Sequence, residues 1–167
     1  DPFAPERFGL RKDGAVFVTI LRNPAERWCS WMSFGRRNNT VDMLPGFVYR
    51  RPDNPYVRMF ADRMYPPSPL NSDEDVSVAL SVLEEFDVVM TFEALDDPRL
   101  EKLLRLRLAW THPELRNVFN KKPSFAVPSC REKDLPADTV NFIKQRSALD
   151  YEVYEYAKQR MERDLKS

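Results

Sequence analysis

The sequence has only four glycines, two cysteines and one histidine among its 167 residues. Proteins that wrap phosphates in backbone amides usually do so with glycine-rich loops, and the Gly-x-x-x-x-Gly-Lys-Ser/Thr pattern of a P-loop does not occur here. With only Cys29 and Cys130, a disulfide framework is not expected, and a single bridge between the two stays open. The longest apolar run, Ala15 to Leu21, is far shorter than the ~20 residues that a membrane-spanning helix needs.

No charge of either sign is in excess. Lys+Arg and Asp+Glu both number 26, so nothing global points to nucleic acid or to a membrane surface, and any anion site must be local. With 43% hydrophobic residues the chain can bury one ordinary core, and we expect a single domain over residues 1–167. The chain opens on Asp-Pro-Phe-Ala-Pro, without Met, so we expect the numbering to start inside a longer protein.

The order of the predicted elements is that of a layered α/β fold. The continuous apolar, β-branched run from Ala15 to Leu21 predicts a strand buried on both faces, as in a parallel sheet, and residues 86–92 predict a second strand. Residues 37–53 carry no period and are interpreted as a long surface loop. Helices are predicted over 24–36, 56–64, from 72 onward and over 98–108, with two more between 135 and 165 that pack back on the sheet.

The chemically informative segment follows the first strand. Arg22 stands at the carboxyl end of that strand, where α/β sheets bind ligands, and Asn23 and Pro24 begin a helix whose first amides we expect to be free donors. Arg22 can hold a phosphate in a two-point fork, and Ser30, two turns into the helix, can add a hydroxyl donor. The alternative is structural, because an Arg at such a junction commonly forms a surface ion pair.

Residues 22–30, Arg-Asn-Pro-Ala-Glu-Arg-Trp-Cys-Ser, resemble the Arg-x-Pro-x-x-Arg-x-x-Ser element of sulfotransferases that use 3'-phosphoadenosine 5'-phosphosulfate, in which it holds the 3'-phosphate. The flanking residues are most similar to those of the Golgi glycosaminoglycan enzymes, especially the heparan and uronyl 2-O-sulfotransferase group. Residues 54–59, 83–89 and 149–157 show supporting similarities in the same order, so that the resemblance extends from about Val16 to Ala157.

The resemblance implies an α/β, P-loop NTPase-like sulfotransferase fold with a central parallel sheet flanked by helices, of which this chain is the C-terminal portion. It implies transfer of a sulfuryl group from 3'-phosphoadenosine 5'-phosphosulfate to a hydroxyl of a carbohydrate acceptor, with adenosine 3',5'-bisphosphate as product. No metal and no nucleic-acid partner are implied. The full-length protein is expected in the Golgi lumen or membrane, whereas the acceptor and the oligomeric state are not indicated.

By the same resemblance, Arg22 and Ser30 contact the 3'-phosphate, and Arg27 is expected to be a structural partner of an acidic residue on a neighbouring element. A late basic loop resembles the one that closes over the nucleotide in this family. Its candidate contacts are Arg116, Lys121 and Lys122, although the two lysines could equally be a solvated surface pair.

A second basic group flanks the long loop and consists of Arg36, Arg37, Arg50 and Arg51. Such a patch would attract a sulfated or carboxylated sugar chain, and Arg36 and Arg37 are the candidate acceptor contacts. Ordinary exposed charge is the alternative. His112, the only histidine, is assigned no catalytic role.

Neither the 5'-phosphosulfate loop nor the acceptor-activating base of this family is found in the sequence. We therefore expect this chain to bind and orient the donor, and not to transfer sulfate by itself, which labelled-sulfate assays on the chain and on a version extended upstream would test. Two other functions stay open. One is a non-catalytic nucleotide-binding or interaction module with a degenerate sulfotransferase fold, and the other is a different P-loop transferase, such as a small-molecule kinase, which would require magnesium.

Overall fold

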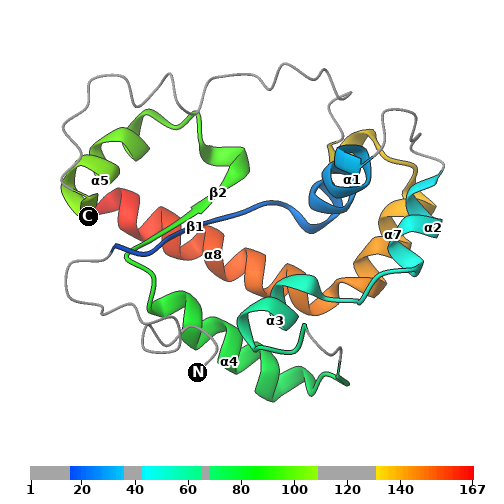
Figure 1. The fold of residues 1–167 in the computed structure, drawn as a ribbon. Helices are drawn as coiled ribbons and strands as arrows, with labels where there is room; N and C mark the ends of the chain where they lie inside the picture. Colours follow the sequence, from blue (N-terminus) through cyan, green and yellow to red (C-terminus); the bar gives the residue numbers. More distant parts are fainter. Residues whose placement is uncertain (1–15, 36–42, 65–67, 109–130) are drawn as a thin grey trace.

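The computed structural model describes residues 16–35, 43–64, 68–108 and 131–167 (Figure 1). These residues form a mixed α/β structure that is mostly helical, so the expected α/β class is confirmed. The elements are β1 (Val18–Leu21), α1 (Pro24–Gly35), α2 (Leu44–Tyr49), α3 (Pro55–Phe60), α4 (Ser72–Glu84), β2 (Val88–Thr91), the 3-10 helix η3 (Phe92–Ala94), α5 (Pro98–Leu108), the 3-10 helix η4 (Glu132–Asp134), α7 (Ala137–Arg146) and α8 (Ala148–Lys166).

The sheet of the described residues has two parallel strands, with Val18 opposite Val88 and Leu21 opposite Thr91. Every residue of β2 is buried, whereas Ile20 in β1 is 43% exposed. The prediction that the first strand is buried on both faces is therefore wrong. The physical reason is that the helices cover β2, while β1 has no second neighbouring strand among the described residues.

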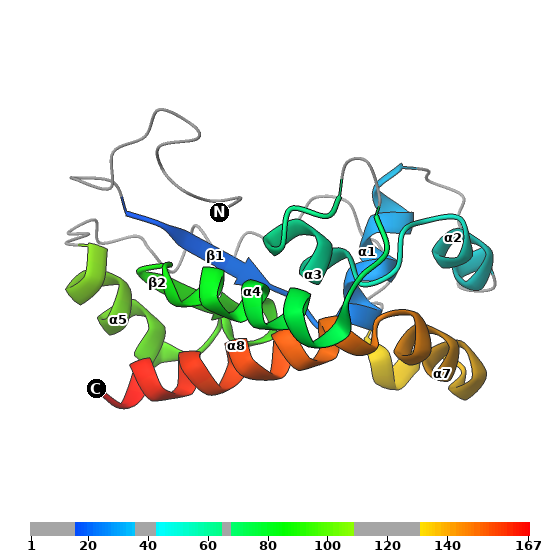
Figure 2. The same cartoon turned by 90° about the horizontal axis from the view of Figure 1, so that it is seen from below.

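Helix α8 runs along the sheet beside α4 and α5 (Figures 1 and 2). Its residues Val153 and Ala157 share a core cluster with Val89 of β2. One turn later, Met161 packs with Val88 and with the leucines of α5, on the other side of the strand. The expectation that a C-terminal helix packs on the sheet is confirmed for α8.

A separate core cluster forms around Trp28 of α1, which is fully buried. It joins α1 to α2 and α7 through Leu44, Val48 and Ile143. The indole Nε1 of Trp28 donates a hydrogen bond of 2.8 Å to Oγ of Ser147, at the junction between α7 and α8. Helix α7 therefore packs on α1 and α2, and the expectation that it packs on the sheet is wrong.

The helices α3 and α8 complete each other's first turns. Oδ1 of Asn54, which directly precedes α3, accepts the amide hydrogens of Leu149 and Asp150 at 3.0 and 3.3 Å. In return, Oδ1 of Asp150 accepts the amide hydrogens of Tyr56 and Val57 at 2.8 and 3.0 Å. We call this arrangement the α3–α8 clasp. It satisfies four amides that a helix start otherwise leaves without a partner.

No helix of the described residues is both long enough and apolar enough to cross a membrane.

Candidate functional site

The predicted N-cap at the start of α1 is confirmed. Oδ1 of Asn23 accepts the amide hydrogens of Ala25 at 2.9 Å and Glu26 at 3.3 Å, and the amide of Arg27 donates to the Asn23 carbonyl at 2.8 Å. Pro24, at the first helical position, has no amide hydrogen. The first turn of α1 therefore has no unused amide, and the expectation of free donors at this helix start is wrong. The Asn that marks the helix start in the sequence is also the residue that occupies these donors.

Arg22 lies at the carboxyl end of β1, and its main chain is fixed by Tyr56 of α3. The Tyr56 hydroxyl accepts the Arg22 amide hydrogen and donates to the Arg22 carbonyl, both at 2.9 Å. Burial raises the pKa of Tyr56 to about 12, against the opposing charge of Arg27, so this phenol remains protonated near neutral pH. The strand end is therefore held in one position by a buried tyrosine.

The Arg22 side chain is partly exposed, at 24%, and loosely paired. Its guanidinium lies 4.5 Å from the centre of the Phe92 ring, and its Nε and Nη2 both lie 3.4 Å from Oε2 of Glu26. A charge-assisted hydrogen bond between such groups is usually about 2.7–2.9 Å long. The guanidinium is thus stacked on an aromatic face, and among the described residues its hydrogen-bonding groups have only a long contact with one carboxylate.

Two further carboxylates reach this strand end, Glu93 from η3 and Glu132 from η4. Glu93 accepts the amide hydrogen of Asn23 and the hydroxyl hydrogen of Tyr154, both at 2.8 Å. Glu132 accepts the side-chain amide of Asn23 at 2.6 Å and the hydroxyl of Tyr151 at 3.1 Å. Both carboxylates therefore have short hydrogen bonds from several donors, whereas the contacts of Glu26 with the Arg22 guanidinium and the Glu132 amide are all 3.4 Å long.

The ionisation of these groups follows from their surroundings. Burial opposes it, but hydrogen bonds from Asn23, Lys144 and Tyr151 lower the pKa of Glu132, which is also 3.0 Å from Nζ of Lys144. Burial and the neighbouring glutamates raise the pKa values of Tyr151 and Tyr154. Glu132 is therefore charged near neutral pH, and the two tyrosines remain neutral donors.

The sequence did not single out Glu93 and Glu132. Glu93 stands just after β2, and because parallel strands end at the same edge of a sheet, this position could have been predicted to lie near Arg22. Glu132 is separated from Asn23 by 109 positions, and no pattern in the sequence indicates that contact.

Ser30 lies on α1, one helical turn beyond Glu26 and partly buried. Residues four apart lie on the same face of a helix, so Glu26 stands between the strand end that carries Arg22 and the Ser30 hydroxyl. A single phosphate held by Arg22 and Ser30 would therefore have to replace Glu26 as the partner of the guanidinium.

Arg27 has no direct contact with an Asp or Glu among the described residues, so the expected pairing with an acidic residue is not found there. Its guanidinium lies 4.5 Å from the centre of the Tyr56 ring, and its positive charge lowers the pKa of Asp150 on α8, a residue of a neighbouring element. The other predicted nucleotide and acceptor contacts lie outside the described residues: Arg116, Lys121, Lys122, Arg36 and Arg37, together with His112 and Cys130. Cys29 is buried in α1 and does not carry a free thiol.

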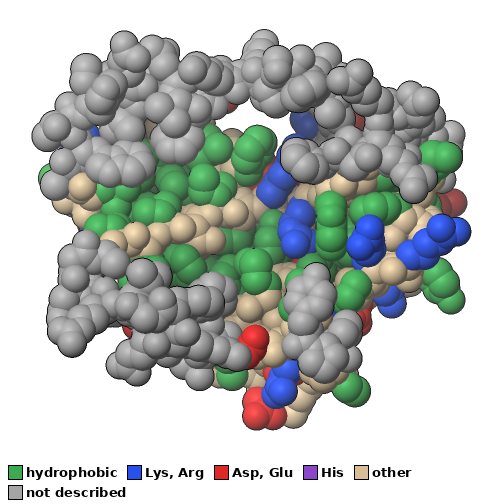
Figure 3. Space-filling view, viewed as in Figure 1, with side chains coloured by type: hydrophobic (Ala, Val, Ile, Leu, Met, Phe, Trp, Pro, Cys, Tyr) green, Lys and Arg blue, Asp and Glu red, His purple; other side chains and the backbone are tan. Residues whose placement is uncertain are grey.

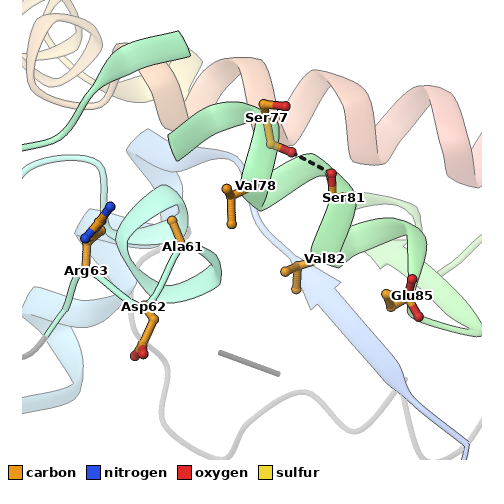
Figure 4. Close-up of a pocket in the computed structure, with 8 residues that line it drawn as sticks. All are labelled: Ala61, Asp62, Arg63, Ser77, Val78, Ser81, Val82 and Glu85. Carbon is orange, nitrogen blue, oxygen red and sulfur yellow. Dashed lines mark hydrogen bonds between the residues drawn. The ribbon is translucent and has the colours of Figure 1, made fainter. Parts of the chain in front are cut away.

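An open hollow of about 550 Å³ lies elsewhere, between the end of α3 and α4 (Figure 4). Its Arg63 is paired with Asp75 at 3.0 Å. It includes neither Arg22 nor Ser30, so the hollow does not extend the strand-end site. The residues that line it are Ala61, Asp62, Arg63, Ser77, Val78, Ser81, Val82 and Glu85.

Within the part of the chain that the structure describes, no group of three His, Cys, Asp or Glu side chains could hold a metal ion. Comparison of the chain with protein-family models, with curated proteins and with solved structures finds no match.

Proposed function

We propose that this chain is part of a sulfotransferase that uses 3'-phosphoadenosine 5'-phosphosulfate, and that Arg22 and Ser30 bind the 3'-phosphate of the donor. The observation that carries the proposal is the state of Arg22. Its main chain is fixed at the end of a parallel strand, its guanidinium is stacked on Phe92, and its hydrogen-bonding groups have only a 3.4 Å contact with Glu26. The resemblance of residues 22–30 to the family motif supplies the identity of the phosphate.

The carboxylates around Arg22 disfavour a bound phosphate, but they do not do so equally. Glu93 and Glu132 are each bonded to two or more donors, which offset their charge. Glu26 is the one carboxylate that competes directly with a phosphate for the guanidinium. We infer that Glu26 is the counter-ion of Arg22 in the absence of a ligand and gives up this contact when the phosphate binds.

In this function the donor supplies the sulfuryl group, which passes to a carbohydrate hydroxyl. The contribution of this chain is to bind and orient the leaving nucleotide. Arg22 would bind the phosphate through two charge-assisted hydrogen bonds, and Ser30 would donate its hydroxyl hydrogen to it. Tyr56 would hold the end of the strand that carries Arg22. The fold would then be the P-loop-like sulfotransferase fold, and the full-length protein would work in the Golgi.

Calorimetric titration with adenosine 3',5'-bisphosphate tests the proposal. Arg22→Ala should weaken binding by about 30- to 1,000-fold, because a charged contact contributes on the order of 2–4 kcal/mol. Ser30→Ala should weaken it by about tenfold, which corresponds to one hydrogen bond. Glu26→Gln should strengthen it, because the competing charge is removed.

The matched control is Arg105→Ala, because Arg105 forms the same i,i+4 pair with Glu101, at 3.0 Å, far from the site along the chain. Arg105→Ala should leave the affinity unchanged, and adenosine 5'-monophosphate, which lacks the 3'-phosphate, should not distinguish Arg22→Ala from the wild type. Equal affinity of Arg22→Ala and the wild type for the bisphosphate would refute the assignment.

A nucleotide-binding module without catalysis is the second candidate, because neither a P-loop pattern nor an acceptor-activating base is found in the sequence. Assays of labelled sulfate transfer to glycan acceptors with the full-length protein separate the two. Binding of the bisphosphate without any transfer would support the module.

A further inference from the structure

The arginines of the described residues divide into two groups. Most of them form an ion pair with an Asp or Glu within 4.0 Å. Four arginines have no such partner among the described residues. Each of these four is at least partly exposed or has a side-chain nitrogen that needs a hydrogen-bond partner. These four are Arg27, Arg50, Arg51 and Arg146.

Two of these four arginines, Arg27 and Arg51, lie over the same aromatic ring. The guanidinium groups of Arg27 and Arg51 lie 5.4 and 5.2 Å from the centre of the Trp31 ring. Arg51 also lies 5.3 Å from the centre of the Phe47 ring, and Nη2 of Arg146 donates to the Arg51 carbonyl at 2.8 Å. Stacking on an aromatic face orients a guanidinium and leaves its N–H edges for carboxylate oxygens.

The neighbouring surface is rich in the residues that form protein interfaces. Residues 43–52 read Met-Leu-Pro-Gly-Phe-Val-Tyr-Arg-Arg-Pro and contain no Lys, Asp or Glu. Met43 is 56% exposed and Tyr49 is 74% exposed, next to the exposed Arg50 and Arg51. Aromatic residues, Met and Arg are enriched in interface cores, whereas Lys, Asp and Glu are depleted. Figure 3 shows Lys and Arg side chains over the side of this face that holds α1 and α2, among hydrophobic ones.

We propose that this surface docks a carboxylate-rich segment of a partner protein. We call it the arginine–tryptophan surface and define it by Arg27, Trp31, Phe47, Tyr49, Arg50 and Arg51. Positive charge that has no carboxylate partner among the described residues is complementary to carboxylates of another molecule, which the planar guanidinium can bind in two-point contacts. The inference does not rest on the proposed phosphate site, because it uses neither Arg22 nor Ser30, but it assigns Arg50 and Arg51 to a protein partner in place of a sugar chain.

The contacts of Trp31 favour a protein segment over a nucleic acid. Its ring stacks on Trp28, with 5.3 Å between the centres and 17° between the planes, and two guanidinium groups lie over it. The indole is therefore not open for the base stacking on which single-stranded nucleic acids depend. The exposed Met43 and Tyr49 provide apolar contact area for the apolar residues of an acidic peptide.

The test measures the fluorescence anisotropy of a labelled peptide of four Glu-Glu-Leu repeats as the protein is added. The wild type should bind it saturably, and more weakly as salt is raised. The double variant Arg50→Gln/Arg51→Gln should bind at least about tenfold more weakly, because two charged contacts are lost. The matched control is Lys102→Gln/Lys133→Gln, which removes two exposed lysines that have no ion pair and no aromatic neighbour among the described residues, and it should bind within about twofold of the wild type.

Far-ultraviolet circular dichroism establishes that both double variants are folded. Three results would overturn the proposal: no saturable binding by the folded wild type, equal weakening in the two double variants, or tighter binding of a heparin oligosaccharide or a single-stranded oligonucleotide than of a peptide of equal charge. The last result would show that the surface binds a sulfated sugar chain or a nucleic acid and not an acidic protein segment.

Discussion

At the scale of single residues, Asp150 combines deep burial with incomplete hydrogen bonding. Only 1% of it is exposed, and its Oδ2 is buried without a hydrogen-bond partner. Burial raises its pKa to about 7, against the amide hydrogens of Val57 and Tyr56 and the charge of Arg27, while Asp53 adds to the rise. The α3–α8 clasp therefore depends on a carboxyl that changes its charge near neutral pH.

We predict that Asp150→Asn reduces the pH dependence of stability. Because the pKa in the folded state lies above the value of about 3.9 in the unfolded chain, the folded state holds its proton longer, and stability falls as the pH rises from about 4 to 7. The Asn side chain can still accept the two amide hydrogens but does not titrate. Chemical denaturation at a series of pH values should show the variant gaining on the order of 2–4 kcal/mol relative to the wild type across this window.

Asp138→Asn is the control for that experiment, since Asp138 is exposed in the first turn of α7. Its stability difference from the wild type should stay nearly constant with pH. A constant difference for Asp150→Asn as well would show that Asp150 is ionised in the folded protein throughout.

At the scale of elements, Asn54 has two separable roles, and substitutions should separate them. Its backbone is in the left-handed region, at φ 44°, and its side chain accepts two amide hydrogens of α8. Asn54→Gly keeps the backbone conformation and loses the hydrogen bonds, at a cost of about 1–2 kcal/mol. Asn54→Ala loses the same hydrogen bonds and also places an Ala in the unfavourable left-handed conformation. Its free energy of unfolding should therefore be about 1 kcal/mol lower than that of Asn54→Gly. Equal unfolding free energies of the two variants would mean that the backbone conformation relaxes.

Helix α2 offers a stabilising substitution. Gly46 is exposed in a helical segment, and a Cβ added there would meet no atom within 4 Å. Gly46→Ala should therefore raise the free energy of unfolding by about 0.5–1 kcal/mol, because Ala loses less conformational freedom in a helix. Thermal unfolding measures it, and a lower melting temperature would contradict the helical assignment.

The sequence predicts elements well where their own residues determine them. The start of α4 at residue 72 and the bounds of α5 were correct, and Asn23 caps α1 as its residue type indicates. Helix α2 was missed because Pro45 and Gly46 within a short segment are typical of a loop. The burial of β1 was misjudged because a strand's neighbours, and not its own residues, determine whether it is covered.

The same distinction applies to the candidate site. The positions of Arg22 and Asn23 follow from the local pattern, whereas the partners Tyr56 and Glu132 come from segments 34 and 109 positions away. Local periodicity contains no information about contacts at that separation, so the contact of Glu132 with Asn23 could not be predicted, whereas the position of Glu93 follows from the shared edge of two parallel strands.

At the scale of the whole molecule, α8 connects the other elements, and Arg160 is its central link. Arg160 is 9% exposed, and its guanidinium donates to the carbonyls of Leu83 and Phe86, between α4 and β2. Arg160→Met leaves both buried carbonyls without this donor and should lower the free energy of unfolding by about 2–3 kcal/mol. Arg163 lies three residues further along α8, and its side chain is 66% exposed. Arg163→Met should therefore lower the free energy of unfolding by less than about 0.5 kcal/mol.

Urea denaturation of the two arginine variants, followed by circular dichroism and tryptophan fluorescence, tests this link. Because α8 takes part in the core on both sides of β2, both probes should report one transition at one midpoint for each variant. Similar losses in the two variants would show that charge at the end of α8, and not the buried contact, sets the stability.

The α3–α8 clasp also has a consequence for the order in which the chain folds. Each of the two helices receives its terminal acceptor from a residue more than 90 positions away, so neither first turn is complete before the distant partner arrives. A nascent chain that has emerged only as far as α5 would expose the unprotected beginning of α3. Synthesis of the last segment would then close both ends in a single event, which makes the C-terminal helix a requirement for the N-terminal half to hold its shape.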